Sequence, residues 1–123
     1  MLVLDTPQMV HLTSGLLRDT GYSVTFSSSA GDALRLCSTT KPHLIVAETQ
    51  IPELDITRFY NALKQHASTQ NSALIGLSFR ATAAEEARLL DMGFIDFIAK
   101  PVNAVRLNAR VRRALRLLYQ DGR

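Results

Sequence analysis

The feature that most constrains the fold of this chain is a regular alternation of short apolar segments with amphipathic segments. Each apolar segment has the length and residue types of a β-strand, and each is followed by apolar residues at helical spacing. The predicted strands are 1–4, 22–26, 43–47, 73–78 and 94–99. Strands and helices that alternate in this way imply right-handed βαβ crossovers and a parallel sheet that is covered on both faces. We therefore expect an α/β fold, a doubly wound five-stranded parallel sheet in a flavodoxin-like (β/α)5 three-layer sandwich.

The helices between these strands are marked by apolar faces and by residues that cap helix ends. The predicted core-facing positions are Met9, Leu12, Leu16 and Leu17 in the first helix, Ala33, Leu34 and Cys37 in the second, and Phe59 and Leu63 in the third. Asp55 is a predicted amino-terminal cap, and Gly21 and Gly93 are expected to end the first and fourth helices. The last helix is expected to run from about Asn103 to Tyr119.

Length and composition limit the class of protein. The chain has 123 residues, of which 46% are apolar, and this is enough for one core, so we predict a single domain over residues 1–123. No segment has the roughly 18 consecutive apolar residues of a membrane helix, and no signal sequence is recognisable, so we expect a cytoplasmic protein without a membrane partner. The single cysteine, Cys37, cannot form a disulfide framework and is expected in the core.

Four polar or charged residues stand at the ends of predicted strands: Asp5, Glu48, Ser78 and Lys100. The carboxyl ends of parallel strands share one edge of the sheet, beside the point where the strand order reverses, so we expect these side chains to meet. A phosphoryl-accepting site needs a nucleophilic carboxylate, acidic ligands for a hard cation, and donors to the phosphoryl oxygens. The two carboxylates, the hydroxyl and the ammonium supply most of these groups.

Several segments resemble the receiver domains of two-component response regulators. They are "LVLDTP" at 2–7, "LIVAETQIPELD" at 44–55, "LS" at 77–78 and "GFIDFIAKP" at 93–101. The resemblance covers essentially the whole chain and implies roles for single positions. By that resemblance Asp5 matches a magnesium-binding acid, Gln50 the residue whose carbonyl is a metal ligand, Ser78 the hydroxyl that contacts the phosphoryl group, Phe97 the aromatic switch position, and Lys100 the lysine of the Lys-Pro pair.

Two residues depart from the receiver pattern where the chemistry would occur. Leu4 stands at the first position of the usual acidic pair, and Glu48 stands at the position of the phosphate-accepting aspartate. Leu4 removes a carboxylate from a cation site that has few charges. The extra methylene of Glu48 moves its carboxylate by roughly 1.5 Å, and a misplacement of about 1 Å can slow a positioned reaction about a hundredfold. A third departure, Ile56 where a glycine is common, decides nothing by itself.

We therefore predict a degenerate receiver, or pseudo-receiver, that is not phosphorylated and is not an enzyme. It is expected to bind Mg²⁺ weakly or not at all and to need no other cofactor. Glu48 is expected to pair with Lys100, and its charge would either hold the domain in an active-like arrangement or simply satisfy a lysine that is otherwise buried without a partner. The sequence leaves these two alternatives open. A cis peptide bond is expected between Lys100 and Pro101, where strand five turns tightly into the last helix.

The last predicted helix carries a basic face. Arg106, Arg110 and Arg113 recur at three- and four-residue spacing in a chain of net charge +3. The acidic residues nearby are Glu85, Glu86 and Asp91 in the preceding helix and Asp96 in the strand between them. Complementary strips suit a two-fold contact, so a weak homodimer through this face is expected; a solvated, salt-bridged surface is the alternative explanation.

Function is therefore expected to proceed through protein partners, either a second copy or an output domain of a longer regulator. The competing function is a basic nucleic-acid-binding module that uses the arginine-rich last helix. A flavin enzyme is disfavoured because "DTPQMV" at 5–10 lacks the glycine- and hydroxyl-rich phosphate loop that such a site requires. The sequence ends soon after the last helix, which fits either a stand-alone module or, as the abrupt first strand suggests, a piece of a longer regulator.

Overall fold

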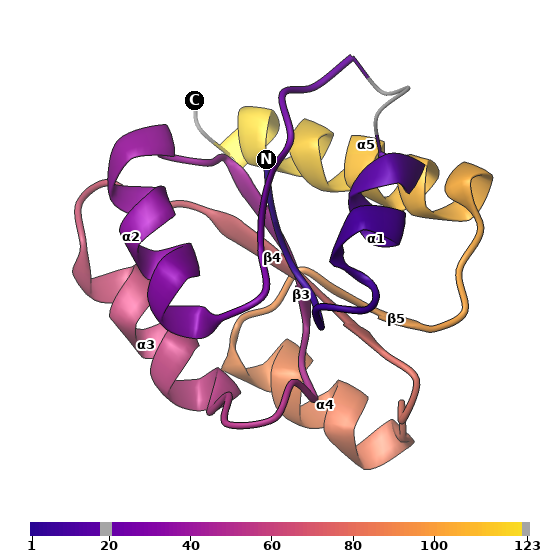
Figure 1. Cartoon of the computed structure of the whole chain (residues 1–123). Helices are drawn as coiled ribbons and strands as arrows, with labels where there is room; N and C mark the ends of the chain where they lie inside the picture. Colours follow the sequence, from indigo (N-terminus) through magenta and orange to yellow (C-terminus); the bar gives the residue numbers. More distant parts are fainter. Residues whose placement is uncertain (18–20, 122–123) are drawn as a thin grey trace.

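A single parallel sheet forms the middle layer of the molecule (Figure 1). The structure is a computed structural model and describes residues 1–17 and 21–121. The strands are β1 (Leu2–Leu4), β2 (Thr25–Ser27), β3 (Leu44–Glu48), β4 (Ala73–Ser78) and β5 (Asp96–Ala99). The helices are α1 (Val10–Leu16), α2 (Ala30–Thr40), α3 (Ile56–Gln65), α4 (Ala83–Met92) and α5 (Ala104–Asp121). The predicted α/β class with a five-stranded, doubly wound sheet is confirmed.

The strand order, β2-β1-β3-β4-β5, places the point where the chain reverses its direction of winding at β1 and β3. Every pair in the sheet is parallel, and Leu4 is paired with Ser27 on one side and with Ala47 on the other. The carboxyl ends of all strands therefore lie at one edge of the sheet. This edge is where functional groups gather in open α/β sheets.

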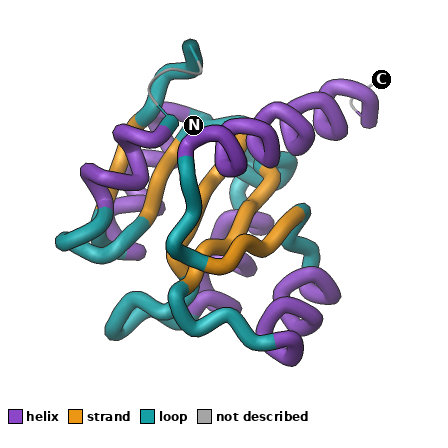
Figure 2. Tube along the Cα trace, turned by 90° about the vertical axis from the view of Figure 1, so that its right-hand side faces the viewer, coloured by secondary structure: helices purple, strands orange, loops and turns teal. Residues whose placement is uncertain are grey.

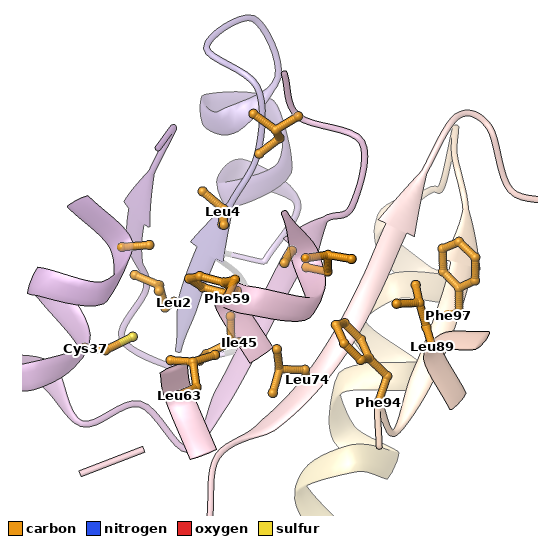
Figure 3. Packing of buried hydrophobic residues seen from close by; sticks show 14 residues of the cluster. Leu2, Leu4, Cys37, Ile45, Phe59, Leu63, Leu74, Leu89, Phe94 and Phe97 are labelled. Carbon is orange, nitrogen blue, oxygen red and sulfur yellow. The ribbon is translucent and has the colours of Figure 1, made fainter. Parts of the chain in front are cut away.

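Helices cover both faces of the sheet, as the tube view in Figure 2 shows. The cluster between the sheet and α1 and α5 includes Val3, Val46, Leu107 and Val111, all with at most 1% exposure. The cluster on the opposite face packs against α2, α3 and α4, and Figure 3 shows its side chains converging on the sheet. We call this second group the core cluster; its labelled members are Leu2, Leu4, Cys37, Ile45, Phe59, Leu63, Leu74, Leu89, Phe94 and Phe97.

Helix ends follow the predicted capping residues. The side chain of Asp55 accepts a hydrogen bond from the backbone N–H of Arg58, as expected for an amino-terminal cap of α3. Gly93 ends α4 with φ 132°, a backbone conformation that suits glycine. A Cβ at Gly93 would also collide with the hydroxyl end of the Tyr60 side chain from α3, which would have to shift.

The first helix differs from the prediction. Leu12, expected to face the core, is 57% exposed, because the buried positions of α1 are Val10, Thr13 and Ser14. The helix ends at Leu16, and residues 18–20, which precede the predicted stop at Gly21, lie outside the described residues. The buried face of α1 is thus partly polar, which an apolar spacing rule does not detect.

Two further expectations concern the end of the chain. The peptide bond between Lys100 and Pro101 is cis, as predicted. The last helix begins one residue later and extends further than expected, from Ala104 to Asp121. Among residues 1–17 and 21–121, none of the helices has the length and apolar character that would let it cross a bilayer.

Candidate functional site

Four strand-end residues come together at the carboxyl edge of the sheet, as predicted from the topology. Asp5 directly follows β1, Glu48 ends β3, Ser78 ends β4 and Lys100 directly follows β5. Their exposed fractions are 0% for Asp5, 4% for Glu48, 0% for Ser78 and 8% for Lys100. We call Asp5, Glu48, Ser78 and Lys100 the strand-end site. Charged groups so deeply buried are stable only when they are paired and hydrogen-bonded.

Asp5 is the central acceptor of this site. Its Oδ1 accepts from the ammonium of Lys100 at 2.8 Å and from the backbone N–H of Thr6 at 2.8 Å. Its Oδ2 accepts from Lys100 at 2.7 Å and from the hydroxyl of Thr13 at 2.7 Å. A carboxylate offers about four lone-pair positions. All four positions of Asp5 are therefore taken by donors of the chain itself.

Glu48 lies near Lys100 but is not its closest partner. Glu48 Oε1 is 3.6 Å from Lys100 Nζ, within ion-pair distance, whereas both short hydrogen bonds of the ammonium go to Asp5. Glu48 Oε2 accepts from the backbone N–H of Gln50 at 3.1 Å, and the side chain of Gln50 is exposed. The expected pairing of Glu48 with Lys100 is present as a longer contact. The main partner of Lys100 is Asp5, which was not expected in this role.

Ser78 is fixed by the backbone on both sides. Its hydroxyl oxygen accepts from the backbone N–H of Arg80 at 3.0 Å, and its carbonyl accepts from the backbone N–H of Lys100 at 2.8 Å. The second bond ties the end of β4 to the residue that follows β5. Ser78 and Lys100 are thus held next to each other by the main chain.

The donor set at this edge is poor for a divalent cation. Leu4, at the position where receivers carry an acid, is fully buried in the core cluster. No three His, Cys, Asp or Glu side chains within the described ranges are grouped so that they could hold a metal ion. Mg²⁺ prefers near-ideal octahedral oxygen coordination, and the carboxylate oxygens of Asp5 are already bonded. The residues present do not fit this cation in the observed arrangement.

Phe97 lies in β5 with its ring 5% exposed, packed over a glycine of the neighbouring strand. A Cβ added to Gly76 in β4 would lie 3.2 Å from the ring of Phe97 and 3.2 Å from the methyl group of Thr49. The aromatic ring therefore fills the space that a side chain at position 76 would need. Glycine at position 76 therefore leaves room for the Phe97 ring, and the ring accounts for a glycine in the middle of a buried strand.

The residues of the predicted dimer face lie on α4, β5 and α5. Arg110 and Arg113 contact Asp96 of their own chain, at 3.0 and 3.5 Å, and Glu85 pairs with Arg88 at 2.9 Å. Asp96 and Glu85, which were expected to meet arginines of a second subunit, therefore have arginine partners within their own chain, and the dimer contact stays a prediction. Within the described part of the chain, Arg106 and Glu86 are exposed and their side chains make no ion pair.

Two contributors to the site were missed from the sequence. Thr13 of α1 donates a hydrogen bond to Asp5. The sequence pattern that could have indicated this role is a polar residue at the spacing of the buried helix face. Phe79 follows Ser78, and its ring centroid lies 5.1 Å from Lys100 Nζ. The signal for Phe79 was a bulky aromatic residue directly after a strand-end hydroxyl.

Both the sequence and the fold are similar to those of known proteins. The chain matches the family described as response regulator receiver domain over residues 1–112. A crystal structure of a response regulator from Desulfuromonas acetoxidans is 44% identical, covers 96% of this chain and 97% of that chain, and superimposes with a TM-score of 0.85.

Two curated relatives are longer proteins. The signal transduction histidine-protein kinase BarA of Escherichia coli (strain K12) is 29% identical over 122 residues, which are 99% of this chain but 13% of that protein. The alkaline phosphatase synthesis transcriptional regulatory protein PhoP of Bacillus subtilis (strain 168) is 29% identical over 116 residues, 94% of this chain and 48% of that protein. The chain therefore spans only one part of these relatives.

Proposed function

The chain belongs to the response regulator receiver domain family, and within it we propose a pseudo-receiver that signals through protein contacts without accepting a phosphoryl group. Receiver domains are signalling modules of two-component systems. The proposal concerns how this one differs: its strand-end site is occupied by its own side chains. Its partners would be proteins, either a second copy of the chain or an output domain, and its place would be the cytoplasm.

The observation that carries the proposal is the state of Asp5. Three groups, the Lys100 ammonium, the Thr6 N–H and the Thr13 hydroxyl, make four hydrogen bonds to its carboxylate, and Asp5 is fully buried. A cation would have to displace at least one of these bonds and enter without the second acid that Leu4 replaces. We therefore propose that Mg²⁺ binding is weak or lost. Without the cation, the negative charge of an incoming phosphoryl group would be poorly stabilised.

Glu48 supports the same proposal by its length. Its carboxylate reaches to 3.6 Å from Lys100 Nζ, and the residue is only 4% exposed. A carboxylate that already contacts the lysine would compete with a phosphoryl group for the same position. In this role Glu48 is a second, more distant negative partner of Lys100. The charge of Lys100 is then balanced without a phosphoryl group.

The test is intact-mass spectrometry after incubation with acetyl phosphate and Mg²⁺. The native chain should gain no phosphoryl group, because both the acceptor and the cation site are altered. Glu48→Asp and Leu4→Asp alone should also remain unlabelled, since each restores one of two requirements of the same transition state. The double variant Leu4→Asp/Glu48→Asp should show Mg²⁺-dependent labelling. A phosphoryl group on Glu48 of the native chain would overturn the proposal.

We also propose a weak homodimer through α4, β5 and α5. The exposed, unpaired charges of Arg106 and Glu86 favour a contact in which they meet across a two-fold axis. Arg106→Glu should shift sedimentation equilibrium toward monomer, more strongly at low salt. Arg112→Glu, an exposed position on the same helix, controls for the change in net charge. A monomer at every concentration tested would refute the dimer and leave the phosphorylation result untouched.

A further inference from the structure

An exposed aromatic ring lies against the most deeply buried ion pair of the described residues, Lys100 with Asp5. Phe79 is 54% exposed, yet its ring centroid is 5.1 Å from the Nζ atom of Lys100, which belongs to a residue only 8% exposed. A ring face at this distance attracts a cation, and the attraction grows when the cation is shielded from water. Phe79 thus borders solvent on one side and the strand-end site on the other.

The main chain fixes Phe79 in this place. Phe79 lies between Ser78, whose carbonyl accepts from the Lys100 N–H at 2.8 Å, and Arg80, whose N–H donates to the Ser78 hydroxyl at 3.0 Å. The residues on both sides of Phe79, Ser78 and Arg80, are therefore hydrogen-bonded at the end of β4. These two hydrogen bonds restrain the backbone of Phe79 beside Lys100, so rotation of its side chain is the smallest change that would uncover the ammonium.

The other groups around the ammonium come from inside the site. Lys100 donates to both oxygens of Asp5 at 2.7 and 2.8 Å, and Glu48 Oε1 lies at 3.6 Å. These three oxygen atoms belong to two buried side chains, since Asp5 and Glu48 are at most 4% exposed. Of the three described side chains in contact with the ammonium, those of Asp5, Glu48 and Phe79, that of Phe79 reaches the surface.

We propose that Phe79 is a movable cover over the strand-end site, and that displacing its ring exposes the Lys100 ammonium to small molecules in solution. The cover is a steric obstacle separate from Glu48 and Leu4. It deepens the proposed function, because it gives the closed site an entrance that a partner could control by taking up the exposed ring. Aromatic side chains with one exposed face are well suited to such contacts.

Amine acylation measures the exposure of Lys100 directly. The chain has three lysines, Lys41, Lys64 and Lys100, and Lys41 is exposed and serves as an internal reference. Trypsin does not cut before proline, so Lys100 is read in the fragment 89–106, whether or not it is labelled. The measured quantity is the acetylation rate of Lys100 relative to Lys41 with an N-hydroxysuccinimide ester, followed by peptide mass spectrometry.

In the native chain Lys100 should react much more slowly than Lys41. Phe79→Ala should raise its relative rate by about threefold to tenfold, as expected for the loss of a shielded cation–π contact. Phe79→Gln, which also removes the ring but keeps a longer side chain, should give a rise in the same direction and guards against a folding failure of the alanine variant. Thermal unfolding checks that both variants are folded.

Two controls separate a cover from a loosened turn. Arg80→Ala changes the same turn, and Phe26→Ala removes another exposed phenylalanine, 42% exposed in β2; neither should alter the Lys100 rate. An unchanged rate in both Phe79 variants, or an equal rise in Arg80→Ala, would overturn the cover. This failure would leave the proposed function standing, whereas phosphoryl labelling of the native chain would remove that function without affecting the lysine rates.

Discussion

The strand-end site and the core cluster are both closed to water, but they are stabilised in opposite ways. In the strand-end site, Asp5 at 0% exposure and Lys100 at 8% are charged. In the core cluster, Leu63 at 0% and Phe59 at 2% are apolar and contact only by packing. A buried ion pair depends on particular donors at particular distances, while an apolar cluster depends on filled volume. The two regions should therefore respond differently to the same kind of substitution.

The comparison also separates what each region can be used for. An apolar cluster tolerates changes of shape that conserve volume, and it fixes the helices without creating chemistry. A buried pair whose acceptor positions are all filled is held in one arrangement, because losing one partner exposes the other to an environment that cannot solvate it. The strand-end site is thus the part of the molecule in which the loss of a single partner should lower stability most.

The largest effect should come from breaking the ion pair. Lys100→Met removes the ammonium and leaves Asp5 buried with two of its four hydrogen bonds, so the free energy of unfolding should fall by about 3–5 kcal/mol. Urea denaturation followed by circular dichroism measures this change. Lys41→Met, at an exposed position, is the matched control and should have little effect. A loss below about 1 kcal/mol for Lys100→Met would show that the pair is no more than a surface-type salt bridge.

The next largest effect should come from the core cluster. Leu63→Ala removes a fully buried side chain of α3, and the loss of packing should lower the free energy of unfolding by about 2–5 kcal/mol. Leu63→Met conserves most of the volume and should cost less than about 1.5 kcal/mol. The ratio of the two losses in unfolding free energy sharpens the comparison between the regions. We expect no conservative replacement of Lys100 to cost as little as Leu63→Met. Equal losses for alanine and methionine would contradict a volume-controlled cluster.

The edge of the sheet where the site lies could be predicted from the sequence, whereas the bonding within it could not. The alternation of strands and helices predicts a parallel sheet, and the carboxyl ends of such strands must share an edge, so Asp5, Glu48, Ser78 and Lys100 were brought together correctly. Which carboxylate takes the short bonds of Lys100 depends on side-chain reach across several strands. Strand spacing alone does not decide between Asp5 and Glu48.

Helix α1 shows a second limit of sequence reasoning. The apolar spacing favoured Leu12 as a core residue, yet Leu12 is exposed and the polar residues Thr13 and Ser14 are 2% exposed. Their burial is possible because each hydroxyl has a partner, Asp5 for Thr13 and the Val10 carbonyl for Ser14. A rule that counts apolar residues cannot detect a helix face that is buried through hydrogen bonds.

These two neighbouring hydroxyls provide a smaller and sharper test. Thr13→Val keeps the shape but removes the donor to Asp5 Oδ2 at 2.7 Å, so the free energy of unfolding should fall by about 1.5–3 kcal/mol, as expected for a bond to a charged group. Ser14→Ala removes a bond to a carbonyl of its own helix and should cost clearly less. Chemical denaturation of both variants gives the comparison, and a larger loss for Ser14→Ala would mean that Thr13 does not support the site.

The smallest effect concerns a proton in the core cluster. Burial raises the pKa of the Cys37 thiol to about 11 from an ordinary value of 9.0, and the residue is 2% exposed. Between these two pH values the unfolded chain loses the thiol proton while the native chain keeps it. The unfolded state then binds fewer protons, so stability falls as the pH rises through this window.

At about pH 10 the thiol should account for a loss of about 1 kcal/mol relative to neutral pH. Cys37→Ala removes this titration, so its stability should fall less between pH 7 and about pH 10 than that of the native chain, although it starts lower because of the lost volume. Urea denaturation of both proteins at the two pH values, with a reducing agent present, isolates the difference from the titration of tyrosines and lysines. Parallel losses in the two proteins would show that the thiol is accessible to water, and would weaken the contrast between an apolar cluster that excludes charge and a strand-end site that encloses it.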